Sequence, residues 1–479
     1  MSTPSSLLKA VRGTRDLLPP ETALWARVES VARDVFSRYG FGEIRTPIFE
    51  ATELFARGVG EETDIVSKEM YTWEDRDRLR PDEARAVREA MGMPHKDALV
   101  QRVEDRGIKV LEQKDSLARS LTLRPENTAG VVRAYIEHKL GDSGQLQKLF
   151  YLGPQFRRER PQRGRYRQFW QIGAEVIGPP SAGSESPIRD AEVLEMLATL
   201  LDELGVKGWR LELNSIGSAT DRPRYLAALR EALAPIKHQM SEDNQRRAET
   251  NPLRIFDSKD PSDQHLIYPL PVIGDFLDED SRNHFAQVQI ALHACGVPYT
   301  VNPRLVRGLD YYTRTTFEFT IPSGDASGLG TQNALLGGGR YDGLSEMLGG
   351  PRAPGIGFAI GQDRLMLTLQ AQAGADSLEP RTLNLEPQKL DAYIAPLGPE
   401  RNPAALTLAR ELRRAGLSVE VGDGAFRLKK SFEAADRLAR HIILLGEDEL
   451  ATNILTLKTF ATGEQIKIPR AEVSATIRG

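Results

Sequence analysis

The feature that most constrains the fold is a regular alternation of strand-like and helical segments that begins near residue 390. These segments are Ala392 to Ala395, Ala404 to Ala415, Leu417 to Val421, Lys429 to Arg440 and Ile442 to Leu445. Such alternation predicts a small α/β domain with a mostly parallel sheet over residues 390–479. The polar stretch before it, residues 376–389, is typical of a linker. Because 479 residues are too many for one core, we expect residues 1–375 to form a second domain.

The larger domain is predicted to begin with a helix and an extended segment. Glu21 to Tyr39 follows two prolines and carries apolar residues at helical spacing, and Gly40 ends the pattern. The segment from Phe41 to Pro47 is extended, and a proline at the end of a strand is usual at a sheet edge. A helix beside an edge strand suits either a dimer surface or ordinary core packing, and core packing is the commoner case.

Two long segments have the composition of insertions. Residues 76–115 are dense in charge and are broken at Gly92-Met93-Pro94, which predicts an exposed helical insertion with no identifiable chemistry. Residues 215–303 are largely polar with helical spacing, which predicts a separate helical insert.

Composition excludes several kinds of site. The single cysteine, Cys295, excludes a disulfide framework within one chain, and the seven scattered histidines contain no metal-binding pair, so we expect no metal site. With a net charge of −4, any nucleic-acid partner has to be held by local basic patches. The N-terminus lacks a signal-peptide pattern and no apolar run approaches transmembrane length, which predicts a cytoplasmic protein without membrane contact.

The most basic window, residues 155–167, holds six arginines against one glutamate, and its Pro161 and Gly164 predict a turn between two strands. The strand after it alternates, so that Gln171, Gly173 and Glu175 share one face. A glycine between two hydrogen-bonding side chains removes bulk where a ligand could lie on the sheet. The alternative, a solvent-facing strand, more often carries Lys, Thr or Ser at such positions.

The segment from Leu305 to Thr315 brings a fixed cation, a glycine, a carboxylate and two phenols into six residues, 307–312. On composition alone, an ion-paired surface turn is the commoner explanation of such a segment. Leu121 to Leu123 predicts a strand, and Pro125 suits the first position of the helix that follows, which places Glu126 and Thr128 at a helix start.

Two glycine-rich segments follow. Residues 337–343 predict a turn-rich cluster, and residues 355–361 lead into an apolar helix. The chain contains no Gly-Lys dipeptide, which excludes a P-loop, and the glycines of 355–361 match a dinucleotide-binding pattern poorly. Arginines near glycine-rich turns, with acidic and amide groups on a strand, suit an anionic phosphate beside a small zwitterion.

Five ordered windows, 122–128, 156–176, 305–315, 336–344 and 354–365, resemble the histidyl-tRNA synthetases, a family of class II aminoacyl-tRNA synthetases. The segments RGLDYY (307–312) and GGRYDG (338–343) resemble the two histidine-specific motifs of that family. The resemblance implies an α+β catalytic domain whose antiparallel sheet is flanked by helices, with a helical insert near the tRNA acceptor stem. It also implies a C-terminal α/β anticodon-binding domain and a homodimer built on the helix and strand that end at Pro47.

The resemblance further implies an activity, in which L-histidine is activated with ATP and transferred to the 3′ end of tRNA(His), with Mg²⁺ on the ATP phosphates. Arg307 and Arg157 would be catalytic. The residues implied for histidine are Glu126, Asn127, Thr128, Arg157, Gln171, Glu175, Arg307, Tyr311, Tyr312 and Tyr341. Those implied for ATP are Arg157, Glu159 and Arg364, and those for tRNA are Arg160, Gln162, Arg165, Lys429 and Lys430.

Departures from the family pattern are few. Asn127 stands where glycine is common, and Gln362-Asp363 replaces a Leu-Glu pair before Arg364. One alternative is an inactive synthetase paralogue that acts as a regulatory subunit in histidine biosynthesis. Such paralogues typically lack the anticodon domain and the arginine-rich turn, and this chain has patterns for both. Another alternative, a threonyl or prolyl synthetase, is opposed by the two histidine motifs.

Overall fold

The computed structural model describes residues 8–60, 63–74, 120–258, 260–322, 329, 333–376 and 389–478. Contacts divide the chain into two compact units, Met1–Leu383 and Asn384–Gly479. The predicted charged insertion at 76–115 and all but the end residues of the predicted linker lie outside the described residues. Within the described ranges, no helix is both long and apolar enough to cross a membrane.

Eight strands form the central sheet of the first unit. In spatial order they are β1 (Gly42–Glu43), β5 (Gln147–Phe156), β6 (Gln168–Ile177), β11 (Gly355–Gly361), β10 (Ala334–Arg340), β9 (Thr313–Thr320), β7 (Arg210–Ser215) and β8 (Tyr299–Val301). The six central strands pair antiparallel, and the two edge strands, β1 and β8, pair in parallel with their neighbours. The predicted antiparallel sheet is confirmed, as is the edge position of the strand before Pro47.

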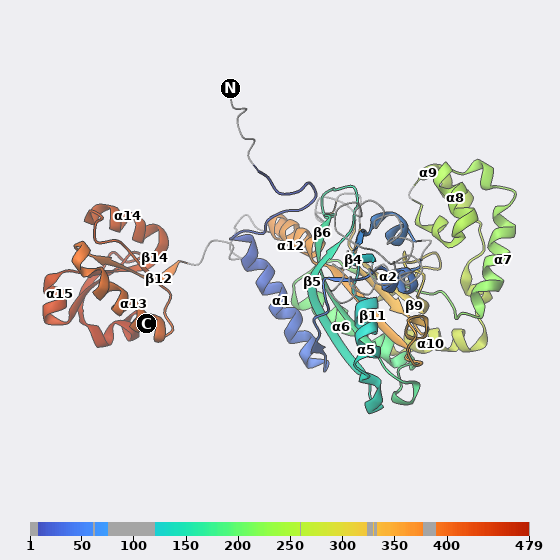
Figure 1. The fold of residues 1–479 in the computed structure, drawn as a ribbon, viewed down its shortest axis with the longest axis horizontal. Coiled ribbons are helices and arrows are strands. Elements are labelled where there is room, and N and C mark those ends of the chain that lie inside the picture. Colours follow the sequence, from blue (N-terminus) through green and yellow to red (C-terminus); the bar gives the residue numbers. More distant parts are fainter. Residues whose placement is uncertain are drawn as a thin grey trace, which may run out of the picture. The chain divides into compact units, whose positions relative to one another are not determined.

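Helices flank this sheet (Figure 1). They are α1 (Glu21–Arg38), α2 (Thr52–Val59), α5 (Thr128–Glu137), α6 (Pro187–Glu203), α10 (Glu279–Ala294), α11 (Leu344–Met347) and α12 (Gln362–Asp376). On α1, the predicted apolar stripe is buried and includes Leu24, Val28, Val35 and Phe36. Helix α1 packs against α6, which in turn packs against α10. The sheet is therefore covered by helices, which is why β6 is buried on both of its faces.

A smaller sheet of three antiparallel strands lies before α5. Its order is β2 (Phe49–Ala51), β4 (Ser120–Leu123) and β3 (Tyr71–Glu74). Strand β4 leads directly toward α5, so the small sheet sets where the start of that helix lies.

The predicted helical insert begins with α7 (Asp221–Leu233), α8 (Glu242–Thr250) and α9 (Pro261–Ile267), which gather beside the sheet (Figure 1). Tyr225 and Leu229 of α7 belong to one apolar cluster with Tyr311, Tyr312 and Tyr341. The insert therefore shares a core with the segment around residue 311.

Over residues 389–478, the second unit contains a five-stranded sheet and four α-helices. The strands in spatial order are β13 (Val419–Val421), β12 (Leu390–Pro396), β14 (Ala439–Leu445), β15 (Ile454–Thr459) and β16 (Gln465–Pro469). The helices are α13 (Asn402–Arg414), α14 (Leu428–Leu438), α15 (Glu447–Thr452) and α16 (Val473–Arg478). The α/β prediction is confirmed, but the mostly parallel sheet was wrong, because β14, β15 and β16 pair antiparallel.

Two local predictions were also wrong. The glycines of residues 337–339 lie within β10 and not in a turn, because they pair with β9 on one side and β11 on the other. Neighbouring side chains and backbone oxygens occupy the space that a Cβ would need at these positions. Helix α5 begins at Thr128 and not at Pro125, since the Glu126 carboxylate caps the backbone N–H groups of the first turn. Glu126 and Thr128 nevertheless lie at the helix start, as predicted.

Candidate active site

Glu175, on β6, is a fully buried carboxylate on which three hydroxyl groups converge. Thr128 Oγ1 donates a hydrogen bond to Glu175 Oε1 at 2.8 Å, and the Tyr341 hydroxyl donates to Oε2 at 2.8 Å. The Tyr151 hydroxyl lies 3.5 Å from Oε1. These hydroxyls come from α5, from the end of β10 and from β5. A few polar groups converging in an apolar interior are typical of a small-molecule site.

Glycines on the adjacent strands make room for these side chains. Glu175 pairs with Gly357 of β11, where a Cβ would stand 1.7 Å from Glu175 Oε2. Tyr151 pairs with Gly173, where a Cβ would stand 2.4 Å from the Tyr151 ring. The space at Gly173, predicted to admit a ligand, is therefore taken by Tyr151. Because these glycines have no side chains, the side chains of neighbouring strands can lie directly above the sheet at the site.

Burial, with a smaller contribution from the nearby Glu126, raises the pKa of Glu175 to about 8, although the hydrogen bonds from Thr128 and Tyr341 oppose the shift. Burial likewise raises the pKa of Tyr341 well above its usual value. The carboxyl of Glu175 is therefore largely protonated at neutral pH. A ligand that donates an N–H to this group favours its ionised form and lowers its pKa.

Glu126 provides a second buried carboxylate at the start of α5. It accepts the backbone N–H of Thr128 at 2.7 Å and that of Ala129 at 3.0 Å. Burial raises the pKa of Glu126, although these two backbone hydrogen bonds oppose the shift. Asn127 turns elsewhere, since its Oδ1 accepts a hydrogen bond from Thr46 Oγ1 at 2.6 Å. The fold thus brings Glu126 and Thr128 to Glu175, and leaves the Asn127 oxygen facing Thr46.

Three tyrosines form an aromatic cluster beside these carboxylates. The ring centroids of Tyr311 and Tyr312 are 4.7 Å apart, and those of Tyr311 and Tyr341 are 5.9 Å apart. All three side chains are buried, and burial raises the pKa of each phenol, so all three are neutral donors at neutral pH.

A buried ion pair fixes the backbone next to Tyr341. The guanidinium of Arg340 is fully buried and binds the Asp190 carboxylate, with Nε 3.1 Å from Oδ1. Its Nη1 also donates to the Ser184 carbonyl and to Asp342, both at 2.9 Å. Because the charge is fully paired, this group holds the end of β10 in one position.

Gln171 lies on the same face of β6 as Glu175. The residue is buried, and its side-chain oxygen has no hydrogen-bond partner within the described part of the chain. An unpartnered buried acceptor destabilises the fold by about 1–3 kcal/mol. Such an oxygen suits a ligand that brings its own donor, such as an ammonium group.

Arg307 lies over the glycine strand β10 and pairs with an acid that was not predicted. A Cβ at Gly337 would stand 2.5 Å from the Arg307 guanidinium. Arg307 Nη1 lies 2.5 Å from Glu318 Oε1, and Glu318 pairs directly with Gly337 across β9 and β10. The negative charge of Glu318 also favours the charged form of Arg364, so one carboxylate lies near two of the predicted arginines.

The predicted turn between β5 and β6 gathers further arginines. Arg157 Nε donates to the Pro125 carbonyl at 2.9 Å, and its guanidinium lies over the Phe169 ring at 5.2 Å. Glu159 lies 3.9 Å from Arg157 and 3.5 Å from Arg165. Arg364 Nε donates to the Gly164 carbonyl at 3.3 Å. Arg157, Glu159 and Arg364, all predicted to bind one ligand, therefore surround the same turn.

Burial and the neighbouring Arg165 lower the pKa of Arg364 to about 10, which leaves it charged at neutral pH. Two backbone hydrogen bonds between Gln162 and Arg165, with Gly164 at φ +72°, close the tip of the turn. Arg160, Gln162 and Arg165 are exposed there, where a large partner can reach them.

The two residues before Arg364 have structural partners. Asp363 accepts the backbone N–H of Trp170 at 3.0 Å and a hydrogen bond from Arg15 at 3.0 Å. The shorter acid at this position therefore ties α12 to β6 and to the N-terminal segment. Among the described residues, no three His, Cys, Asp or Glu side chains are placed to hold a metal ion.

The sequence profile of a family described as Histidyl-tRNA synthetase matches residues 93–250 and 262–365, and that of an anticodon-binding domain matches residues 391–479. A curated relative from Koribacter versatilis, named Histidine--tRNA ligase, is 60% identical over 98% of this chain and 96% of its own length. The chain belongs to the histidyl-tRNA synthetase family.

Further similarity supports this membership over nearly the whole chain. A Histidine--tRNA ligase from Solibacter usitatus is 48% identical over 98% of this chain and 99% of its own length. The solved structure of an apo histidyl-tRNA synthetase from S. aureus matches with a TM-score of 0.72 and 35% identity, covering 99% of this chain and 100% of the other.

The lysines predicted to contact tRNA lie in the anticodon-binding unit of this family member. Lys429 and Lys430 are both exposed in the first turn of α14. Lys430 lies 3.7 Å from the centre of the Phe426 ring, and Lys429 lies 4.0 Å from Glu433. Phe426 is half-buried, and an exposed cation beside an aromatic ring is a combination that suits nucleic-acid contact.

Two site residues were missed in the sequence. Tyr151 can be identified only from the strand register. When β5 and β6 pair as a hairpin through the arginine-rich turn, Tyr151 lies opposite Gly173. Glu318 could have been noticed as the one charged residue in the run from Thr316 to Ile321. Tyr151, by contrast, has no local pattern that distinguishes it from ordinary strand residues.

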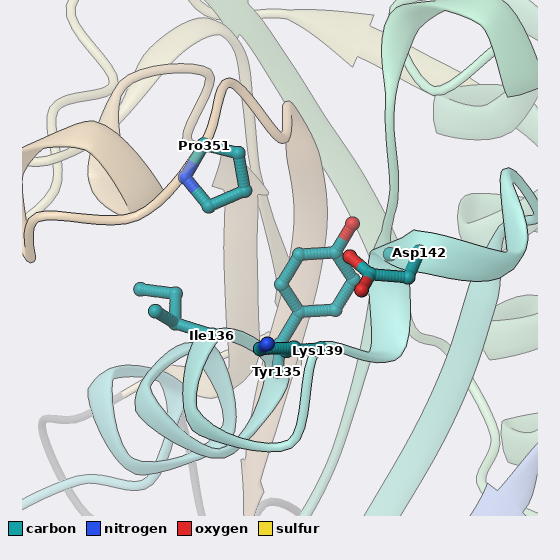
Figure 2. Close-up of a pocket in the computed structure, with 6 residues that line it drawn as sticks. Tyr135, Ile136, Lys139, Asp142 and Pro351 are labelled. Carbon is teal, nitrogen blue, oxygen red and sulfur yellow. The ribbon is translucent and has the colours of Figure 1, made fainter.

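A surface pocket of about 340 Å³ lies elsewhere, where α5 ends. Tyr135, Ile136, Lys139, Asp142 and Pro351 line it together with Gly141 (Figure 2). None of the predicted site residues lines this pocket, so it is separate from the site around Glu175.

Proposed function

We propose that this chain is a ligase that activates L-histidine with ATP and transfers it to the 3′ end of tRNA(His). The full-length similarity to Histidine--tRNA ligases supports the reaction. The observation that supports histidine as the substrate is the environment of Glu175, a buried carboxyl group beside which phenols and a second carboxylate converge.

In the proposed complex, the imidazole of histidine lies between Glu175 and Tyr312. Glu175 accepts a hydrogen bond from the N–H of one ring nitrogen, and the Tyr312 hydroxyl donates one to the other ring nitrogen. Tyr311 and Tyr341 line the pocket. Glu126, Thr128 and Gln171 hold the α-amino group, and the unpartnered oxygen of Gln171 supports this assignment. An amino acid whose side chain lacks matching donors leaves these buried groups unpaired. The efficiency of its activation is therefore lower by about 10⁴-fold or more.

Activation needs positioning and charge stabilisation, and no general base. The histidine carboxylate is ionised at neutral pH and attacks the α-phosphorus of ATP, forming a carboxyl–phosphate bond and releasing pyrophosphate. Arg157 holds the substrate carboxylate and the α-phosphate, and Arg307 stabilises the charge that develops at phosphorus. Glu159 contributes to the ATP site, and Arg364 meets the γ-phosphate. Mg²⁺ enters with ATP as part of the substrate.

Transfer follows when the terminal ribose hydroxyl of tRNA attacks the carbonyl carbon of the histidyl-adenylate, which forms the ester to tRNA, breaks the carboxyl–phosphate bond and releases AMP. Arg160, Gln162 and Arg165 are exposed at the tip of the arginine turn and contact the acceptor end. Lys429 and Lys430 contact the anticodon arm. Asn127 anchors its Oδ1 to Thr46, and its buried Nδ2, which has no hydrogen-bond partner among the described residues, is free to donate to the bound histidine.

The active form is a homodimer. Three apolar side chains are exposed on the small sheet that follows Pro47, namely Ile48 (45% exposed), Phe49 (53%) and Trp73 (40%). The Phe49 and Trp73 ring centroids are 6.2 Å apart, so these two side chains form an apolar patch on the small sheet, and Ile48 directly precedes its edge strand β2. Burying such a patch against a second copy removes apolar surface from water.

A charging assay separates this function from the regulatory alternative. Purified chain, ATP and labelled histidine are mixed with a tRNA(His) transcript or, as the control, with a tRNA of another specificity. The proposal predicts histidyl-tRNA only with tRNA(His). Absence of charging by folded protein that binds histidine would favour the regulatory paralogue.

A further inference from the structure

Arg222, on α7 of the helical insert, reaches the segment that carries Arg307 and the two tyrosines. Its Nη1 donates to the carbonyl of Asp310 at 3.2 Å, and its Nη2 donates to the carbonyl of Tyr312. These two carbonyls flank Tyr311. One guanidinium therefore fixes the backbone on both sides of that residue. The planar arginine side chain can donate two such hydrogen bonds at once, which the ammonium of a lysine does less well.

The insert holds this segment at a second point. Asn251, just after α8, donates from Nδ2 to Asp310 Oδ1 at 3.3 Å. From the opposite side, the backbone N–H of Asp310 donates to the carbonyl of Val59, at the end of α2. A Cβ at Gly60 would stand 2.6 Å from Asp310 Oδ2, so the two segments are in close contact. Residue 310 is thus held between the insert and the end of α2.

Packing acts in the same direction as these hydrogen bonds. Tyr225 and Leu229, on the same helix as Arg222, are buried in one cluster with Tyr311 and Tyr312. Leu309 packs against this cluster and also against the cluster around α2. The insert therefore packs against the rings of Tyr311 and Tyr312, and it also hydrogen-bonds to their backbone.

We propose that Arg222 is a positioning residue for histidine binding, through which the helical insert holds Tyr311 and Tyr312 in the orientation that the imidazole needs. This inference rests on the proposed function. It assigns to the insert a role in the first, tRNA-independent step, because the clamp acts on the amino-acid pocket and requires no nucleic acid.

The test is histidine-dependent ATP–pyrophosphate exchange without tRNA, using full-length wild type, Arg222→Gln, Arg222→Lys and Arg230→Gln. Arg230 is an exposed residue on the same helix and gives a matched control. Active enzyme is counted by single-turnover adenylate formation, and folding is followed by thermal unfolding. These two measurements separate a positioning role from loss of folded protein.

For Arg222→Gln we expect the KM for histidine to rise about tenfold or more, since two hydrogen bonds from a charged group are lost. The KM for ATP should change by less than about threefold, and Arg222→Lys should lie between Gln and wild type because lysine keeps the charge without the fork. Arg230→Gln should match wild type.

The inference is overturned if Arg222→Gln keeps the wild-type KM for histidine, or loses activity only through fewer active sites. An equal rise in Arg230→Gln would also overturn it. If wild type itself shows no histidine-stimulated exchange, the proposed function fails, which distinguishes that failure from failure of the inference alone.

Discussion

Glu175 and Gly357 lie directly opposite each other on β6 and β11, and a Cβ on Gly357 would stand 1.7 Å from Glu175 Oε2. The missing side chain is what allows a carboxylate to lie flat above the sheet, within reach of Thr128 and Tyr341. The same relationship holds for Arg307 above Gly337. The glycine-rich strands therefore shape the pocket as directly as the residues that line it.

Gly357→Ala should displace the Glu175 carboxylate, since the added methyl group overlaps it and also approaches the Ala174 carbonyl. We expect the KM for histidine to rise about tenfold or more, with a loss of stability of about 1–3 kcal/mol from overpacking. Gly343→Ala is the control, because a Cβ there meets nothing within 4 Å. Pyrophosphate exchange and thermal unfolding measure both effects. Wild-type kinetics in Gly357→Ala would show that the pocket does not depend on this contact.

Glu175→Gln tests the buried carboxyl through the pH dependence of stability. The pKa of Glu175 is about 8 in the folded chain against an ordinary 4.5, so the folded state binds more protons between these pH values. The unfolding free energy of wild type therefore falls as pH rises from about 4.5 through about 8, and it levels off once the group is ionised in both states. Glutamine cannot ionise, so the stability of Glu175→Gln relative to wild type should increase from pH 6 to pH 9.

Denaturant unfolding at several pH values measures this difference. Glu137→Gln, an exposed carboxylate on α5, is the control and should show a constant offset from wild type. A constant offset for Glu175→Gln as well would mean that the Glu175 pKa is not raised.

Arg307→Ala should lower the rate of adenylate formation by about 10²–10³-fold or more, because it removes a preorganised cation from the developing charge. Folding should change little, since the Glu318 side chain is 20% exposed and water can hydrate the carboxylate that loses its partner. Rapid-quench measurement of adenylate formation and circular dichroism give the two readouts. Near-normal turnover in this variant would remove Arg307 from the catalytic residues.

Arg165→Ala should reduce aminoacylation of tRNA, because it removes a cation from the exposed tip of the turn. Arg160→Ala should also reduce aminoacylation but leave pyrophosphate exchange unchanged. Among the described contacts, Arg165 reaches Glu159 of the proposed ATP site and Arg160 does not. Comparing charging with exchange in both variants separates tRNA contact from ATP contact. Intact charging in both would mean that the turn does not bind the acceptor end.

Much of this site could be predicted because its residues follow local rules. Gln171 and Glu175 share a strand face by simple alternation, and Glu126 with Thr128 lies at a helix start as the strand-to-helix change predicts. The long helix at Glu21 and the antiparallel centre of the sheet follow from periodicity and from the resemblance of the motifs.

The remainder depends on contacts between distant strands. The glycines at 337–339 have the composition of a turn, and only Arg307, Tyr312 and Phe317 packing above them explains why they form a strand. Tyr151 and Glu318 enter the site through register, which a single strand's sequence does not contain. In the second unit, β15 and β16 add an antiparallel pair after the regular alternation has ended.

The most direct test of the account is amino-acid-dependent ATP–pyrophosphate exchange by the purified chain, with each of the twenty amino acids supplied separately. A pocket built around Glu175, Tyr312 and Gln171 predicts strong stimulation by histidine and about 10⁴-fold weaker use of amino acids that lack a matching side chain. Failure of histidine to stimulate exchange, or better stimulation by another amino acid, would contradict the assignment of this site to histidine.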